Sequence, residues 1–111
     1  MLMLIKAIVR PNKVDDIKSM LDTLSLPGMT VIEVRGHGRQ KGHAATYRGK
    51  EYDVSLLPKS MIEIVVGHEL VDTLVEVLIT TARTGEVGDG RIFVLPVQHS
   101  YSIRTGEKDV V

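Results

Sequence analysis

The sequence contains no cysteine and no tryptophan, and phenylalanine occurs once in 111 residues. The absence of cysteine rules out disulfide bonds and thiolate metal sites, and on that ground alone it leaves the cellular compartment open. Charge of one sign is also lacking, because 14 Lys and Arg residues balance 14 Asp and Glu residues. No broad cationic field is available to nucleic acid or to an anionic membrane, so any anion site must be local.

Neither a secretion signal nor a membrane span is expected at the amino terminus. The run MLMLIKAIVRP is apolar, but Lys6 interrupts it and Pro11 ends it without a small-residue cleavage pattern. We therefore expect a soluble, cytoplasmic protein with a single domain. The four histidines lack the close spacing of a metal-binding helix motif, so we expect no protein-bound transition metal.

The periodicity of apolar residues predicts alternating strands and helices. Asn12 is the expected cap of the first helix, which carries Asp15 and Asp16 in its first turn, and the second helix is expected to have Arg83 in its last turn. Strand patterns cover residues 3–9, 29–36, 60–66 and 91–98, and helical patterns follow Asn12 up to the stop at Pro27 and Gly28 and cover residues 68–85. This order predicts an α+β fold, a ferredoxin-like βαββαβ sandwich with one mainly antiparallel sheet and both helices on one face.

Two helices cover only one face of such a sheet, yet the first and last strands are apolar on both faces. The opposed sets are Leu4 and Ile8 against Ile5, Ala7 and Val9, and Phe93, Leu95 and Val97 against Ile92 and Val94. Because so large an exposed apolar patch is unusual for a monomer, we predict a homo-oligomer joined through the sheets. The alternative is a monomer with scattered surface hydrophobic residues.

The segment between the second and third strands, residues 36–59, has the periodicity of neither a strand nor a helix. Connections of this length in compact domains are commonly functional. Its glycines Gly36, Gly38 and Gly42 bracket Arg39, Gln40 and Lys41. Backbone that approaches an anion closely, beside two cations and an amide, suits phosphate, although a solvated turn has the same composition. No dinucleotide fingerprint or Walker sequence is present.

A second glycine cluster joins the second helix to the last strand. Gly85, Gly88 and Gly90 accompany Asp89 and Arg91. Successive backbone amides in such a turn can form an anion-binding nest, and the arginine adds charge against the negative end of the helix dipole. Two convergent anion loops predict a polyphosphate ligand.

These residues carry a resemblance to a known family. The motifs are GRQKGH at 38–43, YRGKEY at 47–52, LPK at 57–59, IEIVV at 62–66, ARTGEVGDGRIFV at 82–94 and IRTGE at 103–107. In order and spacing the chain resembles the PII nitrogen-regulatory signal-transduction family over essentially its whole length.

The resemblance implies one PII-like domain over residues 1–111 that assembles as a homotrimer with nucleotide sites between subunits. It implies a T-loop at about 37–57, a nucleotide-binding B-loop at about 83–91 and a C-terminal tail at about 99–111. Members bind ATP and ADP competitively and, with magnesium and ATP, bind 2-oxoglutarate at the base of the T-loop. The T-loop then selects partners such as an ammonium channel, a nucleotidylyltransferase, a sensor kinase or a nitrogen-metabolism enzyme, so the membrane is reached only through a partner.

Site residues are carried over from the family by position. The implied nucleotide-binding residues are Thr30, Gly38, Arg39, Gln40, Lys41, Glu63, Val65, Gly88, Asp89, Gly90, Arg91 and Arg104. The implied 2-oxoglutarate-binding residues are Gly38, Gln40, Lys41, Gly42 and Lys59. Gln40 would also ligate magnesium through its side-chain oxygen, a hard ligand for a hard cation. Tyr52 matches the tyrosine that receives a nucleotidyl group in many members, or else it is a loop tyrosine that contacts partners.

Four residues depart from the family pattern. Ser102 stands where a second tail arginine is common, so one phosphate contact is missing, and Lys50 replaces a small residue near Tyr52. His37 replaces an aromatic residue, and Arg91 replaces a lysine, which retains the charge with a different geometry. The resemblance favours an enzyme regulator over two other readings: a ligand-free structural trimer, and a nucleotide-binding protein with slow ATPase activity. No kinase catalytic loop or nucleophile–base pair is evident.

Overall fold

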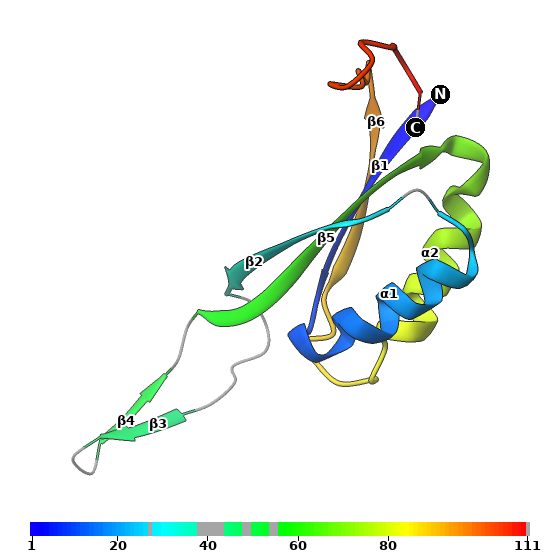
Figure 1. Cartoon of the computed structure of the whole chain (residues 1–111). Helices are drawn as coiled ribbons and strands as arrows, with labels where there is room; N and C mark the ends of the chain where they lie inside the picture. The colour runs from blue at the N-terminus through cyan, green and yellow to red at the C-terminus, as the bar shows by residue number, and fades with distance from the viewer. Residues whose placement is uncertain (27, 38–43, 48–49, 54–55, 111) are drawn as a thin grey trace.

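The computed structural model describes residues 1–26, 28–37, 44–47, 50–53 and 56–110, with the ranges 44–47 and 50–53 as backbone. Four strands, β1 (Leu2–Val9), β2 (Thr30–Gly36), β5 (Leu57–Gly67) and β6 (Arg91–Val97), form one sheet in the order β2-β5-β1-β6. Every neighbouring pair is antiparallel. The helices α1 (Val14–Thr23) and α2 (Val71–Ala82) lie together on one face of it (Figure 1). The predicted ferredoxin-like βαββαβ architecture is confirmed.

The segment expected to lack strands contains a hairpin, so that prediction was wrong. Strands β3 (Ala44–Tyr47) and β4 (Lys50–Asp53) pair antiparallel as a separate sheet, with Ala44 opposite Asp53. The hairpin projects away from the sandwich (Figure 1). A strand that packs on no core needs no alternation of apolar and polar residues, so the pattern that reveals a half-buried strand was absent.

Strand β5 begins three residues before the predicted start at residue 60. Its first residues, Leu57 to Lys59, pair only with β2, because the pairing with β1 ends at Ser60. Pro58 is tolerated there because one edge of this stretch has no neighbouring strand, so its missing amide costs no ladder bond. The strand therefore runs from the core to the root of the T-loop.

The helix ends also differ from the sequence expectation. Asn12 is not a cap: it lies in a 3-10 turn, Pro11–Lys13, and α1 follows without a side-chain capping bond. Pro11 has no amide hydrogen to satisfy and a fixed φ, which suits the start of that turn. Asp15 and Asp16 do lie in the first turn of α1. Arg83 has left the helix, with an extended backbone at the end of α2.

The core lies between the helices and the covered face of the sheet. Alternate residues of β1 and β5 are buried, and Ile5 and Ile64 among them are at most 1 % exposed, as are the helix residues Leu74 and Leu78. The period of two in the strands thus meets the helical stripes, as predicted. No helix in the described part of the chain has the length and apolar character needed to cross a bilayer.

The opposite face of the sheet is uncovered, and it is here called the bare face. Its apolar side chains include Ile32, Phe93 and Leu95, which are 38 %, 44 % and 40 % exposed. One row of register partners crosses it from β2 to β6: Thr30, Glu63, Lys6 and Phe93. In this row the Lys6 ammonium lies 3.8 Å from the Glu63 carboxylate.

Candidate functional site

A cleft opens where the uncovered side of the sheet meets the connection between α2 and β6. Its volume is about 600 Å³, and residues 86–91 line one side. The sheet contributes Ile8, Leu57, Lys59 and Phe93, and His37 lies at the edge where β2 ends. The cleft therefore lies between the predicted B-loop and the two ends of the predicted T-loop.

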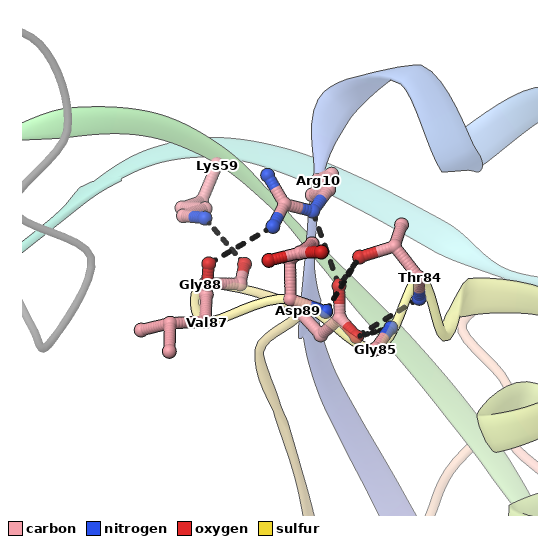
Figure 2. A network of polar contacts seen from close by, with 8 residues as sticks. Arg10, Lys59, Thr84, Gly85, Val87, Gly88 and Asp89 are labelled. Atoms are coloured by element: carbon pink, nitrogen blue, oxygen red, sulfur yellow. Dashed lines mark hydrogen bonds and ion pairs between the residues drawn. The ribbon is translucent and has the colours of Figure 1, made fainter.

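The connection is closed upon itself by Asp89, whose carboxylate points back to the start of the loop (Figure 2). It accepts hydrogen bonds from the amides of Thr84, at 2.9 Å, and Gly85, at 2.8 Å, and from the Thr84 hydroxyl. Gly85, Gly88 and Gly90 have φ values of 90°, 102° and 105°. These left-handed conformations let so short a chain turn sharply enough for Asp89 to reach Thr84.

Two cations contact this loop, Lys59 from β5 and Arg10 from the residue that follows β1 (Figure 2). The Arg10 guanidinium donates from Nε to Asp89 Oδ1 at 3.2 Å and from Nη2 to the carbonyl of Val87 at 3.0 Å. Lys59 Nζ donates to the carbonyl of Gly88 at 2.7 Å. The side chains of Arg10 and Asp89 are 21 % and 24 % exposed, so water screens this ion pair less than one on the open surface.

The surroundings of Asp89 and Lys59 lower the pKa of both side chains. The hydrogen bond from the Thr84 hydroxyl, with those from the two amides and Arg10, holds the pKa of Asp89 far below its ordinary range. Burial lowers the pKa of Lys59, and the nearby Arg10 guanidinium acts in the same direction. A carboxylate with four donors and so low a pKa is a poor general base. Asp89 thus builds the loop, and any contact it makes with an anion must come from its backbone amide.

Gly90 brings the loop against the sheet. A Cβ at this position would lie 1.7 Å from the carbonyl oxygen of Ile8, which no side chain could accommodate without backbone movement. The register places Ile8 opposite Arg91. The pairing of β1 with β6 therefore carries Arg10 to the loop and places Arg91 at the cleft.

The predicted site residues fall into several groups. Lys59 and residues 88–91 meet at the cleft. Thr30 and Glu63 are register partners on the bare face, with Val65 two residues further along β5. The tail that follows β6, which contains Arg104, lies at the end of the sheet opposite the cleft (Figure 1). One chain therefore does not bring Arg104 to Arg91.

The other predicted ligands cannot be placed. Gly38, Arg39, Gln40, Lys41 and Gly42 lie outside the described residues, and Tyr52 is described only as backbone within β4. Within the described ranges, no group of three or more acidic or histidine side chains could hold a metal ion. The predicted ligation of magnesium by Gln40 stays a prediction.

Sequence reasoning missed Arg10 and Thr84. Arg10 precedes Pro11 in a strand-ending segment that carries no ligand motif, and only the antiparallel pairing of β1 with β6 brings it to Asp89. The threonine could have been found locally, because a hydroxyl and amides four and five residues before an aspartate can close a glycine-rich turn.

Comparison with known proteins agrees with the geometry. The family model for nitrogen regulatory protein P-II matches residues 2–107. Nitrogen regulatory protein P-II 1 of Escherichia coli K12 is 54 % identical over 105 residues, which cover 95 % of this chain and 94 % of that protein. Nitrogen regulatory protein P-II of Rhizobium etli is 51 % identical over 106 residues, covering 96 % and 95 %. These relatives are named as regulators, and the chain belongs to the nitrogen regulatory protein P-II family.

Proposed function

We infer that this chain is a cytoplasmic, nucleotide-responsive regulator in which the cleft beside the B-loop takes the phosphates of ATP or ADP. The observation that carries the proposal is the closed loop of residues 84–90, which Asp89 holds in one turn through its hydrogen bonds to Thr84 and Gly85. Arg91 lies at its end, beside the cleft. A preformed turn of glycines with an adjacent guanidinium suits a polyphosphate, because little ordering is left for the ligand to impose.

The active form proposed here is a homotrimer joined through the bare faces. Support comes from the exposed apolar residues of that face and from the tail after β6, which lies far from the cleft of its own chain. Arg104 in that tail would contact a phosphate bound to a neighbouring copy. Thr30, Glu63 and Val65 would then contribute the adenine and ribose end. A site shared between subunits makes nucleotide binding and assembly mutually dependent.

The second effector proposed is 2-oxoglutarate, bound with magnesium and ATP at the base of the T-loop. Lys59 would pair with one carboxylate of the keto acid, Gln40 would ligate magnesium, and backbone groups of residues 38–42 would complete the site. A ligand at this root shifts the T-loop only by its difference in affinity for alternative loop conformations. The loop would in turn select a protein partner, such as an ammonium channel, a nucleotidylyltransferase, a sensor kinase or a nitrogen-metabolism enzyme.

Calorimetry with purified protein tests the proposal. Titration with ADP and ATP is expected to give saturable heats, and 2-oxoglutarate is expected to bind only when Mg-ATP is present. Lys18→Ala removes one cation from the exposed face of α1, away from the cleft, and should bind both nucleotides as the wild type does. Absence of any heat or melting shift with either nucleotide at millimolar concentration would overturn the proposal. Chromatography of the incubated nucleotide distinguishes binding from slow hydrolysis.

A further inference from the structure

Arg10 is the one cation outside the predicted site residues that contacts the closed loop among the described residues. Its single guanidinium spans two acceptors, the carboxylate of Asp89 and the carbonyl of Val87. The next carbonyl along the chain, that of Gly88, faces Lys59. Two successive carbonyls are therefore turned towards cations, Arg10 and Lys59 (Figure 2).

The orientation of these carbonyls fixes that of the amides. In a planar trans peptide the N–H and C=O groups point in opposite directions. The carbonyl of Val87 is turned to Arg10, so the N–H of Gly88 points away from Arg10. The carbonyl of Gly88 is turned to Lys59, so the N–H of Asp89 points away from Lys59. Neither amide donates a hydrogen bond to another described residue, so both donors remain available to an external acceptor beside the cleft.

We propose that Arg10 is a positioning residue for phosphate binding. Its hydrogen bonds to Val87 and Asp89 fix the orientation of the peptide planes, so that two adjacent amides are presented to the same anion. The proposal rests on the proposed function, because the anion is the phosphate chain of the nucleotide. Arg10 itself touches no phosphate. It acts through the backbone that it orients, and its geometry requires a planar fork with more than one donor.

The first test compares nucleotides that differ only in phosphate number. For Arg10→Ala we expect affinity for ADP to fall about tenfold, the loss of one charge-assisted hydrogen-bond anchor, while affinity for AMP changes little. Arg10→Lys retains the charge but not the fork, so its ADP affinity should lie between those of the wild type and Arg10→Ala. Lys18→Ala should match the wild type.

A purely structural role for Arg10 makes a different prediction. In that case Arg10→Ala would lower the melting temperature and would weaken the binding of ADP and of AMP by the same factor. An unchanged ratio of the two affinities therefore overturns the proposal. Equal ADP affinity in the wild type and Arg10→Ala overturns it as well. If the wild type itself binds neither ADP nor ATP, the failure belongs to the proposed function.

Hydrogen exchange tests the loop without any nucleotide. The amides of Thr84 and Gly85 are protected by Asp89, which Arg10 holds in place. In Arg10→Ala, amide exchange in the peptide covering residues 83–91 should accelerate about tenfold, and in Lys18→Ala it should not change. Unchanged exchange in Arg10→Ala would refute the positioning role independently of any ligand.

Discussion

The ammonium of Lys59 lies 2.7 Å from the carbonyl oxygen of Gly88. Lys59 belongs to the part of β5 that pairs only with β2, at the root of the T-loop, whereas Gly88 lies in the B-loop. One hydrogen bond thus joins the two loops that the proposed function assigns to different effectors. The ammonium has three donors, so a carboxylate that binds Lys59 would share it with this carbonyl.

The first prediction concerns this shared lysine. Lys59→Ala should weaken 2-oxoglutarate binding in the presence of Mg-ATP by at least about tenfold, because a charge-assisted contact is lost. The same change should weaken ADP binding less than it weakens 2-oxoglutarate binding, since Arg10 still holds Val87 and Asp89. Calorimetric titration of both ligands measures the two effects, and undiminished 2-oxoglutarate binding would exclude Lys59 as its partner.

The second prediction concerns Asp89. Replacement by Asn puts an amide where Thr84, Gly85 and Arg10 all donate, so Asp89→Asn should lower the free energy of unfolding by about 1–2 kcal/mol at neutral pH. Urea unfolding at one fixed protein concentration measures the change. Glu76→Gln, which neutralises an exposed acid in the middle of α2, is the matched control and should be nearly neutral. Stability equal to that of the wild type would contradict a structural role for the carboxylate.

The third prediction is the pH dependence of that stabilisation. Because the pKa of folded Asp89 is depressed, its contribution is present above the ordinary aspartate pKa of about 3.9 and is lost as the pH falls further. The difference in unfolding free energy between wild type and Asp89→Asn should therefore be larger at pH 6 than at pH 3. A difference that is constant over this range would be inconsistent with the depressed pKa.

The fourth prediction compares two glycines of the B-loop. Gly90→Ala combines a positive φ with a clash against the carbonyl of Ile8, whereas a Cβ at Gly85 would meet nothing within 4 Å. We expect Gly85→Ala to cost about 1–2 kcal/mol from backbone strain alone and Gly90→Ala to cost clearly more. Thermal and urea unfolding rank the variants, and equal costs would show that the β1 contact does not constrain the loop.

The fifth prediction concerns assembly. Phe93→Glu places a charge on the bare face and should shift the protein towards monomer in light scattering, because the charge would lose its hydration at the joined sheets. Met20→Glu, at a similarly exposed site on α1, is the control and should leave the oligomeric state unchanged. An unchanged oligomer in Phe93→Glu would argue against assembly through this face.

The sequence predicted most of the sandwich because its elements are specified locally. The alternation that buries Ile62 and Ile64, and the helical spacing of Leu74 and Leu78, appear directly in the residue order. Asn12 was wrongly assigned as the helix cap because Pro11 starts a 3-10 turn that contains Asn12, and α1 begins only after that turn. The β3–β4 hairpin was missed because it packs on no core, so no burial pattern marks it.

The candidate site was predictable only in part. Glycine clusters and nearby cations indicated anion binding, and family motifs assigned ligands by position. The closure of the loop by Asp89 is a local contact with Thr84 and Gly85. The hydrogen bond from Arg10 to Asp89, by contrast, joins residues 79 positions apart. Such pairings follow from strand register, which sequence patterns constrain only after the topology is known.

The ion pair between Lys6 and Glu63 lies among the exposed apolar side chains of the bare face. A foreign hydrophobic protein that settled there would strip water from both charges and return nothing polar to them, which makes indiscriminate sticking unfavourable. The pair therefore disfavours nonspecific aggregation of newly synthesised chains. A protein that covers the bare face must supply polar groups to Lys6 and Glu63 as well as a complementary shape.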